Sequence, residues 1–397
     1  MPAGGMPSPE MRLVATCCRW PTNVDAIHAA ASGAIDWRYA IRLSRRHRVV
    51  GFLRRGLIAA GIAVPPRLDE IYRHMMRRNL LQYGEAVRLT AKLAEAGIPV
   101  ALLKGVVVAE LAYGGQDVKA TVDNDLLVAP RNVPAALAIL ERAGYRVIDL
   151  PSDGRRPVAA LTDLVYECQL IHPVSGAIVD LHWRLHPYRQ VLGEPDVAAE
   201  ARMVTVEGKQ LPALTGETMM LYLAIHGARH SWSRLKWLAD FNALLSGMDD
   251  GEVAALRTLA RRGGVAPCVD SALIQCKRLL GARVPADVHR SPRARALVRL
   301  SDALIFGPDV DVVPGRYARR WLLTTMVMNT RLSTAGSIFW HVWVSPIDTL
   351  AVPLPRPFHP LYVVISPVRR TSRIVRRLAA RGFARARSRL MRATQEK

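Results

Sequence analysis

The sequence predicts an α+β protein, in which an α/β core with a mixed sheet is flanked by N-terminal helices and a C-terminal helical domain. Three changes in the hydrophobic pattern support this fold class. The period is helical up to residue 97, short apolar runs separated by turns occupy residues 98–212, and the helical period returns in residues 213–333. Residues 334–397 form a fourth region, rich in Pro and Trp up to residue 368 and ending in a basic tail.

The composition indicates a folded protein without a membrane span. The chain has 397 residues, half of them hydrophobic, which is enough for more than one domain with a sizeable core. No apolar run approaches the length of a transmembrane helix, and the N-terminus lacks the apolar segment of a signal peptide, so we expect a cytoplasmic protein. Five cysteines without a CxxC motif indicate reduced thiols rather than a disulfide framework or a structural zinc site.

Positive charge is concentrated at the C-terminal end. The formal net charge is +22, and residues 361–397 hold ten Arg and one Lys against one Glu. Arg residues recur at four-residue spacing from Arg373 to Arg389, which on a helix forms a basic stripe beside an apolar one. This pattern predicts peripheral binding to an anionic membrane surface or a polyanion. A solvated basic tail is the alternative, and charge alone favours it.

The N-terminal region, residues 1–97, is predicted to be a helical layer without catalytic residues. Its first ten residues are rich in Pro, Gly and Ser, which is typical of an unfolded terminus. Pro65 and Pro66 interrupt the helical pattern and begin a long helix over residues 68–96, which we expect to end at Gly97.

Residues 98–212 are expected to form the sheet, because apolar runs of strand length alternate there with turn residues. The predicted strands are Val100–Leu103, Asp125–Val128, Tyr145–Ile148, Val165–Ile171 and Ala177–Arg184, with one more strand or hairpin in Met203–Leu211. The expected helices are Val106–Tyr113 and Val133–Ala143, and, in the helical domain, Glu217–Ala228, Leu235–Leu245, Val253–Arg262, Cys268–Leu280, Pro292–Phe306 and Tyr317–Met328. We expect residues 334–368 to be irregular.

Three carboxylates on predicted strands indicate a metal-dependent site. Asp123 and Asp125 open one apolar run, and residues two apart on a strand face the same side. Asp180 lies within an apolar strand, where a carboxylate is costly unless it binds something, and His182 shares its face. Oxygen ligands of this kind suit Mg²⁺. Lys104-Gly105 ends another apolar run and precedes a helix, whose free N–H groups can bind phosphate.

These segments resemble the DNA polymerase β-type nucleotidyltransferase superfamily, whose signature is a Gly at a strand-to-helix turn followed by DxD. The segments LLKG, AYGG, VDNDLLV, VDLHWRL and HGARHSWSRLKWLADF are similar to a bacterial group known as uncharacterised nucleotidyltransferases. The resemblance implies that Asp123, Asp125 and Asp180 are catalytic and bind the metal, and that Gly105 lies at the phosphate turn. Where the superfamily usually has Ser after this Gly, the chain has Val106, so Lys104 is a candidate substitute.

Further nucleotide-binding candidates lie before the Asp pair and in the helical domain. The resembled group usually carries an Arg shortly before DxD, and here the nearest basic residue is Lys119. In the group, the HGARH segment and the residues after it face the site, which implies that Arg229, His230 and Lys236 reach the triphosphate or the acceptor. A solvated helix face is an equal alternative for Lys236, and Asp240 would pair with it at i, i+4. A zinc site on His226 and His230 is disfavoured, because no HExxH glutamate is present.

The function expected from these features is Mg²⁺-dependent nucleotidyl transfer, with Mn²⁺ as the alternative metal. A nucleoside monophosphate would move from an NTP, with ATP expected, to a hydroxyl of a small molecule, peptide or protein, and pyrophosphate would leave. The alternative is a catalytically degenerate binding or scaffold protein on the same fold, acting through its basic tail.

Overall fold

The computed structural model describes residues 7–148, 162, 165–307 and 314–331, and further on residues 336, 340, 343–344, 348–349, 352 and 354–372. The chain divides into two compact units, Met1–Thr334 and Ala335–Lys397. The finer division of the first unit after residues 97 and 212 stays a prediction. The basic stripe from Arg373 onward lies outside the described residues.

A seven-stranded mixed sheet forms the centre of the first unit, in the order β3-β4-β5-β2-β1-β7-β6. β2 runs parallel to β5 and β1 runs parallel to β7, while the other neighbouring strands are antiparallel. The predicted α+β class and every predicted strand are confirmed, and Met203–Leu211 lies within a hairpin. The strands are β1 Val100–Leu102, β2 Asn124–Val128, β3 Arg146–Val147, β4 Glu167–Ile171, β5 Ile178–His182, β6 Arg202–Val206 and β7 Lys209–Ala213.

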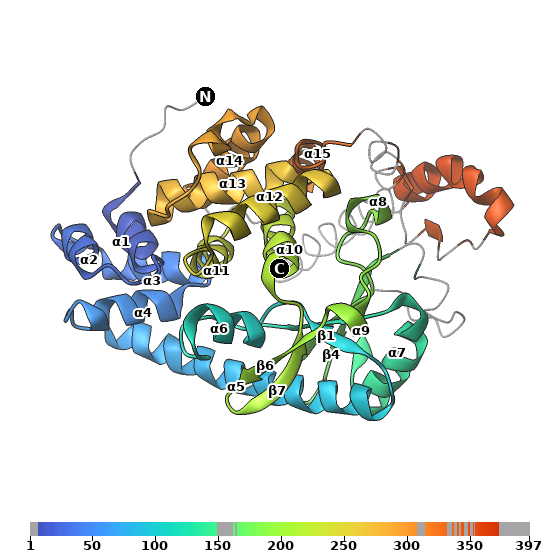
Figure 1. The fold of residues 1–397 in the computed structure, drawn as a ribbon, viewed down its shortest axis with the longest axis horizontal. Coiled ribbons are helices and arrows are strands. Elements are labelled where there is room, and N and C mark those ends of the chain that lie inside the picture. Colours follow the sequence, from blue (N-terminus) through green and yellow to red (C-terminus); the bar gives the residue numbers. More distant parts are fainter. Residues whose placement is uncertain are drawn as a thin grey trace, which may run out of the picture. The chain divides into compact units, whose positions relative to one another are not determined.

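The long helix α5, Pro66–Glu95, packs along the sheet against β1, β2 and β7 (Figure 1). Pro66 lies at its N-terminus, where the missing N–H costs no hydrogen bond, so the predicted start is nearly correct. Shorter helices connect the strands. They are α6 Val106–Tyr113, α7 Val133–Arg142, α8 Arg189–Leu192 and α9 Val197–Glu200, with a 3₁₀ turn at Pro130–Asn132. Of these, α6 and α7 contact α5.

Four helices precede α5: α1 Pro9–Cys17, α2 Val24–Ala31, α3 Trp37–His47 and α4 Val50–Ala59. The expectation that the first ten residues are unfolded is wrong at its end, since α1 begins at Pro9. The Ser8 side chain accepts a hydrogen bond from the Met11 N–H and caps this helix. The apolar side of α1, including Leu13 and Val14, is fully buried, so tertiary packing stabilises a segment whose composition suggested disorder.

A second helical layer follows the sheet in sequence and faces it in Figure 1. α10 is central in this layer and packs against α11, α12, α13 and α15, while α11 contacts α6. The predicted helices of this region are confirmed with small shifts at their ends. They are α10 Gly216–Arg229, α11 Leu235–Leu245, α12 Asp250–Gly263, α13 Ala266–Gln275, α14 Pro292–Ile305 and α15 Pro314–Met328, with a π-helical turn at Cys276–Leu280 and a 3₁₀ turn at Ala286–Arg290.

The second unit has helical structure where the sequence predicted an irregular chain. A 3₁₀ turn covers Arg356–Leu361, and residues 362–372 continue it as a helix. Tyr362 is buried within this unit, and its hydroxyl group donates to the carbonyl oxygen of Val352 (2.6 Å). Among the helices that the structure describes in either unit, none has the length and apolar character needed to cross a membrane.

Candidate active site

A tight turn between β1 and α6 is the first element of the site. Gly105 has a φ of +72° and a ψ of −124°, a backbone conformation that residues with a Cβ rarely adopt. A Cβ here would lie 3.3 Å from the carbonyl oxygen of Asp123, so the turn passes close to the Asp pair. The predicted phosphate turn therefore lies beside the predicted metal ligands.

Two polar side chains of α5 hold the loop that leads into the Asp pair. The Asn79 side chain donates to the carbonyl oxygen of Lys119 (2.7 Å) and accepts from the N–H of Thr121 (2.9 Å). Gln82 Nε2 donates to the carbonyl oxygen of Val122 (2.6 Å). Because these buried amides satisfy loop groups that no strand or helix pairs, they fix the approach of the chain to β2.

The parallel pairing of β2 and β5 brings two of the three predicted carboxylates together. Asp125 is the direct partner of Asp180 in the register of the two strands. Asp123 immediately precedes β2, so it stands at the end of the strand rather than within it. As expected, Asp180 lies on a strand that neighbours the strand of Asp125.

The ammonium group of Lys104 lies between the carboxylates of the Asp pair. Its Nζ is 2.7 Å from Asp125 Oδ1 and 3.8 Å from Asp123 Oδ1. Burial disfavours the charged lysine, but Asp123 and Asp125 outweigh it and hold the pKa of Lys104 well above its usual value. Burial likewise disfavours charged Asp125, but Lys104 and His182 outweigh it and lower the pKa of this carboxyl.

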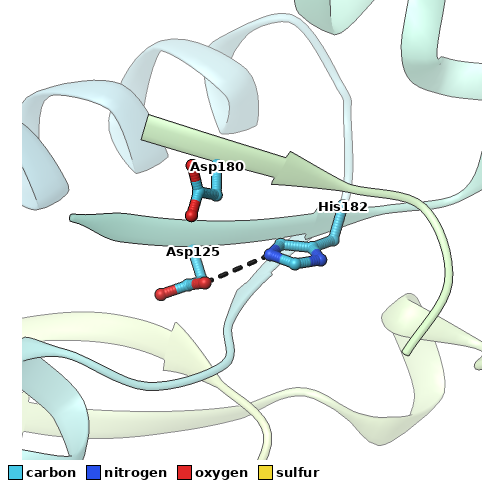
Figure 2. A group of neighbouring side chains, drawn as sticks. All are labelled: Asp125, Asp180 and His182. Atoms are coloured by element: carbon cyan, nitrogen blue, oxygen red, sulfur yellow. Dashed lines mark hydrogen bonds and ion pairs between the residues drawn. The ribbon is translucent and has the colours of Figure 1, made fainter. Parts of the chain in front are cut away.

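His182 is turned toward two acidic side chains. Figure 2 shows its ring directed at Asp125, and its Nε2 is 3.1 Å from Asp125 Oδ1. Its Nδ1 is 3.2 Å from Glu167 Oε2, across the antiparallel pair of β5 and β4. Burial opposes an imidazolium here, but the two carboxylates outweigh it and raise the pKa of His182. The ring therefore contacts both carboxylates and orients Asp125.

Asp180 stands in a less compensated environment. Its Oδ1 accepts a hydrogen bond from Gln169 Nε2 (2.9 Å), its partner residue on β4. Burial, together with the charges of Asp125 and Asp123, raises the pKa of Asp180 to about 7. A carboxylate in this state gains the most from a cation placed next to it.

The donor set fits a divalent cation. One potential ligand atom from each of Asp125, Asp180 and His182 lies within 4.8 Å of the others, and these are the one such group of three in the described part of the chain. Asp125 Oδ2 is buried and has no hydrogen-bond partner. Mg²⁺ is usually held by one or two carboxylates together with substrate phosphates. Asp125 and Asp180 can supply the carboxylates. Asp123 is not in this group. The group and the predicted triad of aspartates therefore share two residues, Asp125 and Asp180.

These side chains line a cavity of about 520 Å³, a volume typical of small-molecule sites. Its acidic residues lie on or next to β2, β4 and β5, and most of its basic residues come from the helical segments before and after the sheet. The Arg229 guanidinium donates to the hydroxyl group of Tyr166 and lies 4.9 Å from its ring centroid. The acidic residues of the lining are Asp123, Asp125, Glu167 and Asp180, and the basic ones are Arg46, Arg48, Lys104, Arg229, Arg234, Lys236 and Arg320.

A comparison with family models matches residues 33–281, more than half of the chain, to the family described as uncharacterised nucleotidyltransferase. The chain belongs to this family. No curated protein matches it. Among solved structures, an antigenic nucleotidyltransferase-like protein from Paracoccidioides brasiliensis is similar at 14% identity, over 51% of this chain and 94% of that chain. The TM-score of this similarity is 0.28.

The cavity contains most of the nucleotide-binding residues predicted for this nucleotidyltransferase. Arg229, His230 and Lys236 line it together with Lys104. Lys236 is half-buried, and its Nζ lies 5.7 Å from the centroid of the Trp237 ring. Burial and the nearby charges of Lys119 and Arg48 lower the pKa of Lys236 to about 7. Lys236 therefore lines the cavity, and its role in nucleotide binding stays a prediction.

Lys119 has another partner and does not line the cavity. Its ammonium forms an ion pair with Asp240 inside the protein, and both residues are buried. The Tyr113 hydroxyl group donates to the other oxygen of this carboxylate (3.0 Å). The expected pair between Asp240 and Lys236 is therefore wrong, because Asp240 faces α6 and the loop after it. Lys119 thus connects α11 to the core through Asp240, and Lys236 faces the cavity without Asp240 as a partner.

The two histidines of the HGARH segment belong to an aromatic cluster. The His230 ring stacks on Trp237 with a centroid distance of 4.8 Å and an interplanar angle of 14°, and His226 lies 4.8 Å from His230. Helix α10 continues through Gly227, where a Cβ would overlap the ring of Trp232. Neither histidine belongs to the group of possible metal ligands found in the described residues.

Sequence reasoning missed several residues of the cavity lining. Glu167 and Tyr166 lie on or next to β4, and the alternation that marked Asp180 and His182 would have identified Glu167 once β4 was paired with β5. Arg48 follows α3, almost two hundred residues before Lys236, and no sequence signal connects them. Arg46 and Arg234 are partly committed to structure, since Arg46 donates to the Leu304 carbonyl oxygen (2.5 Å) and Arg234 to that of Arg46.

Proposed function

We propose that this protein transfers a nucleoside monophosphate from an NTP, with ATP as the expected donor, to a hydroxyl group of an acceptor and releases pyrophosphate. The observation that carries the proposal is one cavity lined by Asp125 and Asp180 on paired strands, by Asp123 next to β2, and by several basic side chains. A nucleoside triphosphate bound with a divalent metal needs both kinds of surface. Membership in a nucleotidyltransferase family supports the same reaction, and we extend it to the DNA polymerase β-type superfamily.

Asp125 and Asp180 are the proposed metal ligands, with Asp123 beside them. Mg²⁺, or Mn²⁺ in its place, would neutralise charge on the phosphates and polarise the phosphorus that is attacked. The fit rests on the buried Asp125 Oδ2, which has no partner, and on the proximity of Asp180. His182 fixes the orientation of Asp125 through its other oxygen.

The basic residues of the cavity are proposed to bind the triphosphate. Arg229 is oriented by Tyr166, and Lys236 and His230 line the same cavity. An Arg presents several N–H donors in a fixed plane, which suits phosphate oxygens. The turn at Gly105 lets the backbone at the N-terminus of α6 approach the phosphates closely. Interactions with the pyrophosphate part stabilise the group that leaves.

The proposed reaction is an in-line displacement at the α-phosphorus. The acceptor oxygen forms a bond to this phosphorus, and the bond from phosphorus to the oxygen that bridges to the β-phosphate breaks. The hydroxyl proton is transferred to Asp180, which is partly exposed to the cavity and neighbours Asp125 in the strand register. Pyrophosphate takes the electron pair of the broken bond. Candidate acceptors are a small molecule, a peptide or a protein side chain.

Calorimetry with MgATP tests the binding part of this proposal. We expect binding to the wild type that is lost when EDTA removes the metal, and strongly weakened binding for Arg229→Ala. As a control, Arg88→Ala changes a residue that forms an ion pair with Glu85 on α5 and does not line the cavity. Absence of MgATP binding to the folded wild type would instead favour the scaffold alternative, in which the basic tail carries the function.

A further inference from the structure

Two positions for a cation adjoin Asp125, one at each carboxylate oxygen. At Oδ1 the position is filled, because Lys104 Nζ lies 2.7 Å away and also 3.8 Å from Asp123. Oδ2 is buried and has no hydrogen-bond partner, and potential ligand atoms of Asp125, Asp180 and His182 lie within 4.8 Å of one another. The predicted triad of aspartates is thus divided between two places.

The position of Lys104 is built into the fold. Its neighbour Leu103 donates its N–H to the carbonyl oxygen of Asp125 (3.1 Å), which ties the end of β1 to β2 at this point. Gly105 follows in a backbone conformation suited to Gly, so the main chain on the other side is also fixed. The Lys104 side chain is 13% exposed and that of Asp125 is 1% exposed. An ammonium group held in this way is part of the site rather than a mobile surface charge.

Displacing this ammonium group would be costly. If Lys104 moved out, Asp125 would lose the ammonium group that lies 2.7 Å from its Oδ1 while remaining buried, and uncompensated buried charges are strongly destabilising. A divalent ion between Asp123 and Asp125 would have to take the place of Lys104, because two cations cannot share this gap at contact distance. Among the described residues, Asp125 Oδ2 has no hydrogen-bond partner to displace, and Asp180 Oδ1 accepts from the neutral amide group of Gln169.

We infer that Lys104 is a built-in cation that occupies the position between Asp123 and Asp125, so that the site binds one divalent ion, at Asp125 and Asp180. This inference rests on the proposed function and specifies its metal requirement. Two-metal sites hold their ions about 3.5–4 Å apart. Here the ammonium group of Lys104 takes the place of one of the two ions. It carries a single positive charge and is covalently attached to the chain, so it cannot exchange as an ion does.

Manganese titration monitored by electron paramagnetic resonance tests the inference with Mn²⁺ alone as the probe. Loss of the free-ion signal counts bound ions, and a spin-coupled signal reports two ions in contact distance. We expect one bound ion and no coupled signal for the wild type. For Lys104→Met we expect two bound ions with a coupled signal, because the vacated gap between Asp123 and Asp125 becomes a second site. Lys104→Arg keeps the charge and is expected to bind one ion.

The matched control is Lys92→Met, which removes an exposed lysine from α5 and is expected to leave one bound ion. Circular dichroism establishes that each variant is folded, and the wild-type count remains decisive if Lys104→Met fails to fold. Two coupled ions on the wild type would overturn the inference and leave the proposed function standing. A single ion on folded Lys104→Met would overturn it as well. No bound ion on the wild type would overturn both the inference and the proposed metal site.

Discussion

Replacing Lys119 by Met separates its structural role from the nucleotide-binding role that the sequence suggested. Lys119 and Asp240 are 4% and 2% exposed, and the Tyr113 hydroxyl group is the other donor to this carboxylate. Removal of one partner of a buried ion pair typically costs about 3–5 kcal/mol, because the remaining charge stays buried. We expect Lys119→Met to lower the free energy of unfolding by about this amount, a large part of the stability of an ordinary domain.

Urea unfolding at constant temperature, followed by circular dichroism, measures this change. The double variant Lys119→Met, Asp240→Leu removes both charges and should recover much of the lost free energy, since no unpaired charge remains. Lys92→Met, on the exposed side of α5, should change stability by less than about 0.5 kcal/mol. The reasoning is refuted if Lys119→Met lowers the free energy of unfolding by less than about 1 kcal/mol but abolishes MgATP binding.

Two further predictions concern the turn and a buried histidine. Gly105→Ala should cost about 1–3 kcal/mol of backbone strain and weaken MgATP binding, whereas Gly33→Ala, with open space around it, should do neither; equal melting temperatures would contradict this. His47 is fully buried, and burial with the charges of Arg46 and Arg234 lowers its pKa to about 3. Below the unfolded pKa of about 6.5 the unfolded chain binds the extra proton, so stability falls as pH falls. Between pH 7 and 5, wild type should lose about 2 kcal/mol more than His47→Gln in urea unfolding, and equal losses would refute the assignment.

The sheet and the aspartates could be predicted because their signals are local. Asp180 stands out in an alternating apolar strand, and the Gly105 turn joins the short strand Val100–Leu102 to the short helix Val106–Tyr113. The sequence could not predict which way Lys119 points, since its partner Asp240 is on a helix 121 residues away. The same limit explains why Arg48 and Glu167 were missed, because tertiary packing and strand pairing bring them to the cavity.

For Lys104, the sequence predicts the place in the chain but not the contact of the side chain. Its place at the turn was predicted, and a phosphate contact was the natural expectation for a lysine before a helix. In the structure its ammonium group instead points toward Asp125. Asp125 lies on β2, and the residues between Lys104 and Asp125 do not reveal that β2 pairs with β1. The order of β1, β2 and β5 in the sheet decides this contact, and order within a sheet is not visible in local sequence.

Transfer of label from an α-³²P-labelled NTP tests the central claim most directly. The folded wild type is incubated with each of the four labelled NTPs, Mg²⁺ and cell extract, and the labelled product is identified by mass. We predict metal-dependent labelling by the wild type and by Asp250→Asn, an exposed carboxylate on α12, and at least a hundredfold less by Asp123→Asn and Asp180→Asn. Labelling that persists in folded Asp180→Asn and Asp123→Asn would contradict the claim that these carboxylates carry the reaction.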